Sequence, residues 1–277
     1  MKKSALVCCI LLLLHSVVVY FFPHVGYPTH QWQKNLVKAQ NYLYDNSNDD
    51  VVVGTSLSYR LLDIPHVSNL SCGGQSMYDG LGLVLCKPKS QRPKRVFIET
   101  NFPFREENSD FQKSLFSPVL YNLHKFIPCT REQYQPICLV SYVLLKLMHI
   151  NPQEGMMNPP KPEVLNQRIE HLISSYKTID NEKIQWAKLK LSTMIAELQH
   201  TGTEIVFFEM PVNERVKESD NFKCTRTFFA ENFPKSKYHY LPNDESVYLT
   251  TDGQHLAYTE QIKYTDYFQK AIRNISF

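Results

Sequence analysis

Short apolar runs bounded by polar residues recur along the chain. Each predicts a buried strand, and the runs cover residues 51–53, 67–70, 95–100, 204–210 and 238–241. Between them, apolar residues recur three and four positions apart, which is the period of an amphipathic helix. The predicted helices cover residues 32–44, 75–85, 164–173, 184–198 and 256–272. Strands that alternate with helices are typical of a parallel sheet covered on both faces, so we expect an α/β fold, a three-layer α/β/α sandwich of about five parallel strands.

A helical insertion is predicted after the third strand. Residues 139–150 are strongly apolar, but this stretch of about twelve residues is too short to cross a bilayer, so it predicts a buried helix. Helical spacing resumes after Pro162, a residue that suits the first turn of a helix. We therefore expect one α/β domain over residues 31–277, with a helical insertion at about 103–200 and an N-terminal segment and linker at 1–30.

Residues 5–22 form an apolar run of eighteen, interrupted only by His15 and Ser16 and preceded by Lys2 and Lys3. The run is long enough to span a bilayer, and the two lysines favour a cytoplasmic N-terminus. A cleaved signal peptide is the competing interpretation. However, bulky aromatic residues follow the run where a cleavage site needs small ones. We expect an uncleaved membrane anchor in the cell envelope, with the rest of the chain outside the cytoplasm.

Composition narrows the classes of partner. A formal net charge of +3 without a basic and aromatic stripe does not indicate binding to nucleic acid.

Of seven cysteines, five lie outside the apolar segment. An exported location permits disulfides, and Cys129–Cys138 is the favoured local pair. The sequence lacks the CxxC and HExxH spacings of metal sites, so we expect neither a metal nor another cofactor.

Two polar positions carry the candidate chemistry. Gly54 ends the first strand, and Ser56 follows at the carboxyl end, where open α/β sheets place their ligands. His255 is the best candidate base among ten histidines, because Asp252 precedes it by three residues. That spacing lets the carboxylate accept from one ring nitrogen while the other faces the serine. Taken alone, Ser56 and Asp252 also suit turn or helix-capping roles.

Together with Gly74 and Asn101, these positions resemble the four sequence blocks of the SGNH (GDSL-type) hydrolases, in the family's order. The resemblance implies a flavodoxin-like sandwich in which Ser56 is the nucleophile, His255 the general base and Asp252 the residue that orients it. It also implies an oxyanion hole formed by the backbone N–H groups of Ser56 and Gly74 and by the Asn101 side chain. Gly73 competes with Gly74 for this role, and the family's second block favours Gly74.

The chain departs from the family at two positions. Thr55 stands where the family usually has an aspartate before the serine, and Phe102 stands where an aspartate often follows the asparagine. The Gly-Thr-Ser-x-Ser form is similar to that of envelope-anchored members that move acetyl groups on exported polysaccharides.

The resemblance therefore implies a membrane-anchored esterase or O-acyltransferase that forms an acyl-enzyme on Ser56. Its substrate would be an acylated glycan or another ester, and a membrane-embedded acyl donor would be its partner. Two alternatives stay open: a lipase or thioesterase of the same fold, and a non-catalytic protein that binds or assembles glycans.

Overall fold

The computed structural model describes residues 2–22, 25–45, 49–150 and 158–275. The chain divides into two compact units, which we call the helical unit and the α/β unit. The helical unit comprises Met1–Asn46 and Ser109–Gln153. The α/β unit comprises Ser47–Asn108 and Glu154–Phe277 and contains every residue of the candidate site.

These boundaries differ from those expected from the sequence. Helix α2 (Gln31–Tyr44) belongs to the helical unit, because Trp32 packs edge-on against Phe111 of α4 (Ser109–Phe116), with ring centroids 5.8 Å apart. The expected insertion at about 103–200 is too long. Helices α7 (Pro162–Ser175) and α8 (Asn181–Gln199) belong to the α/β unit. Both turn apolar side chains to its sheet, so their burial depends on that unit.

The α/β unit is built on one sheet of five strands, all parallel, in the order β2-β1-β3-β4-β5. The strands are β1 (Asp50–Val53), β2 (Val67–Asn69), β3 (Arg95–Glu99), β4 (Glu204–Phe208) and β5 (His239–Tyr240). This is the flavodoxin-like order, and its direction reverses between β1 and β3. Ligands of such sheets bind outside the carboxyl ends of the strands at the reversal, so the topology points to the ends of β1 and β3.

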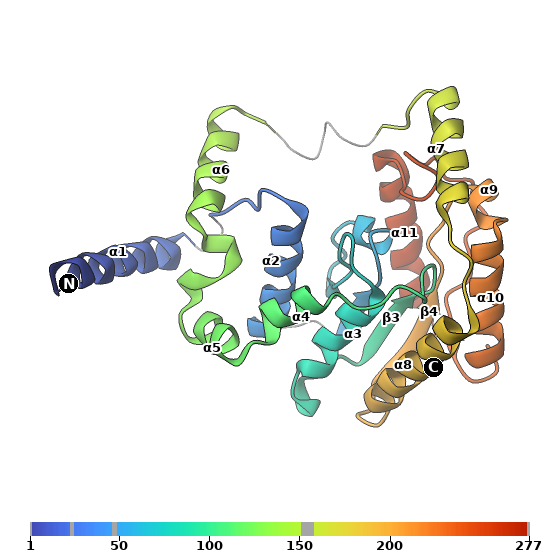
Figure 1. Ribbon diagram of the computed structural model, residues 1–277, viewed down its shortest axis with the longest axis horizontal. Helices are drawn as coiled ribbons and strands as arrows, with labels where there is room; N and C mark the ends of the chain where they lie inside the picture. The colour runs from blue at the N-terminus through green and yellow to red at the C-terminus, as the bar shows by residue number, and fades with distance from the viewer. Residues whose placement is uncertain (1, 23–24, 46–48, 151–157, 276–277) are drawn as a thin grey trace. The chain divides into compact units, whose positions relative to one another are not determined.

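Helices cover both faces of the sheet, which confirms the expected three-layer α/β/α sandwich (Figure 1). The other helices of this unit are α3 (Met77–Cys86), α9 (Glu214–Lys217), α10 (Asp220–Asn232) and α11 (Tyr258–Asn274). On one face, Phe97 and Phe208 pack against Phe268 of α11. On the other, Phe207 packs against Phe229 of α10. Alternate side chains of each strand thus enter separate cores, as the continuous apolar runs require.

The remaining helices belong to the helical unit: α1 (Lys2–Phe21), α5 (Pro118–Phe126) and α6 (Pro136–Leu147). The prediction of a buried helix at 139–150 was wrong about burial. In α6 only Cys138 is buried, whereas Val140 is 53% exposed and Leu147 is 71% exposed. Within its unit α6 contacts the short turn at Glu132–Tyr134, which directly precedes its N-terminal end. The apolar side chains further along the helix therefore stay exposed.

The predicted Cys129–Cys138 disulfide was also wrong, since both thiols are free. Each thiol has a different polar neighbour. Cys129 Sγ lies 3.1 Å from the hydroxyl of Ser16 in α1, and Cys138 donates to the Glu132 carbonyl at 3.3 Å. Val19 of α1 is buried with Cys129 and Tyr134, so the C-terminal part of α1 packs against the helical unit.

Among the described residues, no helix combines the length and apolar character that a membrane span requires.

Candidate active site

Ser56, His255 and Asp252 form one hydrogen-bonded chain in the α/β unit. Ser56 lies in the turn that follows β1, and His255 lies in the loop before α11. The Ser56 hydroxyl is 2.9 Å from His255 Nε2, and His255 Nδ1 is 2.7 Å from Asp252 Oδ2. These are the residues proposed from the sequence as nucleophile, base and orienting carboxylate. The structure joins them by two successive hydrogen bonds, although 199 positions separate Ser56 from His255.

The charge of Asp252 decides which nitrogen of His255 carries a proton. Burial raises the pKa of Asp252, but the hydrogen bond and charge of His255, with the N–H groups of His255 and Gln254, outweigh it and lower the pKa to about 2. An ionised carboxylate only accepts hydrogen bonds, so Nδ1 must carry the hydrogen. The Nε2 lone pair is then free to accept the Ser56 hydroxyl proton. The arrangement can therefore act as a nucleophile and its base.

The loop that presents Asp252 is folded around the carboxylate itself. Asp252 Oδ1 accepts hydrogen bonds from the backbone N–H of Gln254 at 3.0 Å and of His255 at 2.8 Å. This is a local turn that aspartate forms readily, and it leaves Oδ2 for the imidazole. The loop is also tied to α7, where Arg168 donates to the Thr251 carbonyl at 3.0 Å. The Asp-x-x-His spacing thus works because one carboxylate shapes the turn and orients the ring.

A buried carboxylate that the sequence analysis missed organises the turn around Ser56. Glu99, the last residue of β3, is 1% exposed. It accepts from the N–H and hydroxyl of Thr55 at 2.9 and 2.7 Å, and from the N–H and hydroxyl of Ser58 at 3.0 and 2.5 Å. Four donors satisfy a carboxylate that would otherwise be costly to bury. Ser56 therefore stands between two residues that are both fixed to the sheet.

Gly54 makes that arrangement possible. A Cβ atom at this position would lie 2.2 Å from the Ser58 hydroxyl oxygen and 2.5 Å from Glu99 Oε2. These separations are far below van der Waals contact, so any side chain here would push the carboxylate away from the turn. The glycine that the sequence analysis took as a strand breaker is thus required for close approach.

The two proposed backbone donors of the oxyanion hole have free N–H groups. Among the described residues, neither the Ser56 nor the Gly74 N–H donates a hydrogen bond. Gly74 is exposed and has φ +78°, a conformation that residues with a Cβ rarely adopt. Because β2 is the neighbour of β1, Ser56 and Gly74 follow adjacent strands at the same edge of the sheet. Both groups are available to a bound oxyanion.

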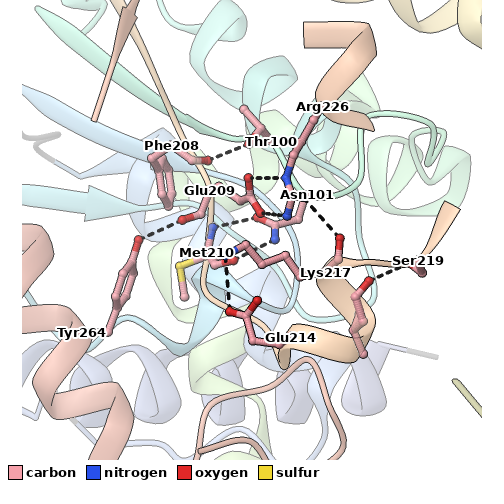
Figure 2. Close-up of polar contacts among 11 residues, drawn as sticks. Thr100, Asn101, Phe208, Glu209, Met210, Glu214, Lys217, Ser219, Arg226 and Tyr264 are labelled. Atoms are coloured by element: carbon pink, nitrogen blue, oxygen red, sulfur yellow. Dashed lines mark hydrogen bonds and ion pairs between the residues drawn. The ribbon is translucent and has the colours of Figure 1, made fainter. Parts of the chain in front are cut away.

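Asn101 follows β3 at the same edge, but its side chain also has a structural task (Figure 2). Its Nδ2 donates to the Met210 carbonyl at 2.9 Å, and its Oδ1 accepts from the Met210 N–H at 2.8 Å. This pairing extends the ladder between β3 and β4, where the Thr100 N–H donates to the Phe208 carbonyl at 2.9 Å. It fixes the plane of the amide and leaves one of its two N–H bonds unused. Asn101 makes no hydrogen bond to Ser56 or His255 in the described part of the chain.

The two departures from the family pattern have physical explanations. An aspartate at position 55 would place a second negative charge against the buried Glu99, whereas Thr55 supplies the hydroxyl donor that this carboxylate needs. Phe102 packs edge-on against Phe222 of α10 with ring centroids 5.7 Å apart. The Arg105 guanidinium lies 5.4 Å from the centre of the Phe102 ring. Each departure is therefore matched by a partner elsewhere in the chain.

No family model matches this chain, and no curated protein matches it in sequence. Among the described residues, no three His, Cys, Asp or Glu side chains are grouped closely enough to hold a metal ion.

Proposed function

We propose that this chain is a serine-dependent ester hydrolase or O-acyltransferase that forms an acyl-enzyme on Ser56. The hydrogen-bonded chain from Ser56 through His255 to Asp252 carries the proposal. Its distances of 2.9 and 2.7 Å suit proton transfer, and the ionised Asp252 sets the imidazole tautomer that a base requires. The free N–H groups of Ser56 and Gly74, which follow neighbouring strands, support an adjacent oxyanion hole.

The reaction follows from these positions. His255 Nε2 takes the hydroxyl proton as Ser56 Oγ forms a bond to the carbonyl carbon of an ester. The carbonyl oxygen becomes an oxyanion, which the backbone N–H groups of Ser56 and Gly74 stabilise. The bond to the leaving alcohol then breaks, and the imidazolium returns its proton to that alcohol. Water or a second hydroxyl group attacks the acyl-enzyme in the same way, which gives an acid or a new ester and restores Ser56.

The substrate we propose is an acylated, most simply acetylated, glycan of the cell envelope. The similarity to envelope-anchored members of the SGNH hydrolases supports this substrate, and the apolar sequence of residues 5–22 is the ground for proposing a membrane-anchored location outside the cytoplasm. The exposed apolar side chains of α6, which shares a unit with α1, add to that support, because soluble surfaces rarely carry large apolar patches. A membrane-embedded protein would supply the acyl group in the transferase form.

Covalent labelling tests the proposal. A fluorophosphonate probe should label wild-type protein at Ser56, and labelling should disappear in Ser56→Ala and fall strongly in His255→Ala. Ser114→Ala and His171→Ala are matched controls, since both lie outside the site. Hydrolysis of p-nitrophenyl acetate should follow the same pattern. A protein that binds glycans but neither labels nor turns over would support the non-catalytic alternative. Release of fatty acid rather than acetate would support the lipase or thioesterase alternative.

A further inference from the structure

A cavity of about 440 Å³ opens beside Asn101 in the α/β unit. Three aromatic rings, Phe102, Phe104 and Phe222, contribute to its wall, and polar residues of the segment after α7 and of α10 complete it. Such a mixture of apolar wall and few polar groups is typical of sites for small ligands or for single units of a polymer. Its volume suits a sugar ring.

Helix α7 connects the cavity with the loop that carries Asp252 and His255: a Cβ atom at Gly253 would lie 3.5 Å from Leu172 of α7, and Arg168 of α7 donates to the Thr251 carbonyl at 3.0 Å. Tyr176 directly follows this helix and precedes cavity residue Lys177. Burial raises the pKa of Tyr176 to about 12, the charge of Asp252 adds to the rise, and the charge of Arg105 opposes it. The Tyr176 hydroxyl is buried without a partner among the described residues.

The charges around the cavity are unbalanced. Arg105, Lys177 and Lys183 line it, and Glu106 is the single acidic residue among its lining residues. None of these four side chains makes an ion pair within the described part of the chain. By contrast, Arg226 of the same unit pairs with Glu209 at 3.0 Å. Three unpaired cations against one carboxylate leave a positive surplus that favours an anionic ligand.

We propose that this cavity binds a carboxylate-bearing sugar of the substrate, next to the acylated unit held at Ser56. The inference rests on the proposed function and narrows its substrate to an acylated acidic glycan. The guanidinium of Arg105 suits a carboxylate because its planar fork can donate two parallel hydrogen bonds. Lys177 and Lys183 add positive charge, and the rings of Phe102 and Phe222 offer apolar faces to the C–H groups of the sugar.

Kinetics on two polymers test this cavity. Wild-type protein should have a lower KM for acetylated polygalacturonate than for a neutral acetylated xylan. Lys177→Ala and Lys183→Ala should each raise KM for the acidic polymer about three- to tenfold, as expected for loss of one charged contact. Both changes should raise KM for the acidic polymer more than KM for the neutral one, because only the acidic polymer carries the carboxylate that the lysines attract. Lys188→Ala is the matched control, because this exposed lysine lies on α8 with Lys183 but outside the cavity. Equal KM values for the two polymers, unchanged by the cavity variants, would overturn the proposal.

Binding separates failure of the cavity from failure of the catalytic proposal. Calorimetry with de-acetylated trigalacturonate needs no turnover and can use the full chain carrying Ser56→Ala. Binding that weakens with added salt and with Lys177→Ala supports the cavity even when no ester is cleaved. Absence of trigalacturonate binding in a protein that still hydrolyses p-nitrophenyl acetate would reject the acidic-sugar site and leave the catalytic proposal standing.

Discussion

The carboxylate of Glu99 accepts two hydrogen bonds from Thr55, one from its backbone N–H at 2.9 Å and one from its hydroxyl at 2.7 Å. Because Glu99 ends β3 and Thr55 follows β1, these bonds join the turn to the two strands that flank the topological reversal. A nucleophile gains from such support, since small displacements of the attacking atom are costly in rate. Among the described residues Glu99 bonds to Thr55 and Ser58 and not to Ser56, so in the proposed reaction it would act by positioning Ser56.

Glu99→Gln should destabilise the fold and slow the reaction. An amide supplies one acceptor oxygen and one NH₂ group, so its NH₂ would face donors from the turn. Buried donors left without acceptors cost about 1–3 kcal/mol in the free energy of unfolding. Urea unfolding measures this loss, and the rate with p-nitrophenyl acetate measures the displacement of Ser56. Glu170→Gln, which removes an exposed carboxylate 3.3 Å from Arg215, should change neither. Wild-type stability and rate in Glu99→Gln would contradict the role.

Thr55→Asp, which introduces the residue usual at the resembling position of the SGNH hydrolases, should lower stability and activity in this chain. It would bring a carboxylate against the buried Glu99 and remove a hydroxyl donor at 2.7 Å. Like charges at that distance with little solvent repel strongly. Thr55→Ser keeps the hydroxyl and should remain near wild type, so it is the matched control. Thermal unfolding of the two variants, measured side by side, distinguishes them. Equal midpoints would show that Thr55 is not required by Glu99.

The fold could be predicted because its signals are local. Apolar runs and helical spacing marked all five strands and four of the helices that cover them, α3, α7, α8 and α11, but not α9 or α10. Asp252 and His255 could be proposed for the same reason, since three positions separate them and one turn joins them. Glu99 could not be found in this way, because its partner Ser58 lies 41 positions away. The one available signal was an acidic residue at the end of a strand that is otherwise apolar.

The errors in the helical unit have a related cause. The apolar composition of residues 139–150 indicates a tendency to be buried, but it does not identify the segment that would pack against them. In the structure the apolar side chains of α6 remain exposed. The placement of α2 depends on the contact between Trp32 and Phe111, which are far apart in the sequence. A pair of cysteines nine positions apart likewise does not fix the direction of their side chains, and both thiols are free.

Asp252→Asn should reduce kcat with p-nitrophenyl acetate by between about 10²- and 10⁴-fold. An asparagine can present an NH₂ group to His255 Nδ1, which would favour the tautomer whose Nε2 carries the hydrogen and cannot accept from Ser56. KM should change little, because Asp252 is not expected to contact the substrate. Fluorophosphonate labelling should slow in parallel. A variant with wild-type kcat would show that the orienting carboxylate is dispensable.

The same carboxylate should make stability depend on pH in a defined window. The pKa of Asp252 is about 2 in the folded chain, below the ordinary value of about 3.9 for an unfolded chain. Between these values the unfolded state binds more protons, so stability from this group rises with pH. It is fully present above about pH 4 and is lost as pH falls through about 2. The difference in unfolding free energy between wild type and Asp252→Asn should therefore shrink as pH is lowered from 5 to 2.5. A difference that does not vary over this range would contradict the lowered pKa.

Asn101→Ala and Asn101→Asp test the two tasks of this side chain. Alanine removes both hydrogen bonds to Met210 and the unused N–H of the amide. It should therefore lower stability and reduce kcat by about 10²–10³-fold, the usual cost of losing one oxyanion donor. Aspartate keeps an acceptor for the Met210 N–H, but it turns its other oxygen toward the Met210 carbonyl and cannot donate to an oxyanion. It should therefore reduce kcat at least as much and also lower stability, because a buried carboxylate without a donor is costly. KM should be nearly constant in both variants, because the interaction forms mainly in the transition state. Urea unfolding and steady-state kinetics give the two quantities independently. If kcat falls only in proportion to the loss of folded protein, Asn101 serves the β3–β4 junction alone and the oxyanion hole consists of backbone donors.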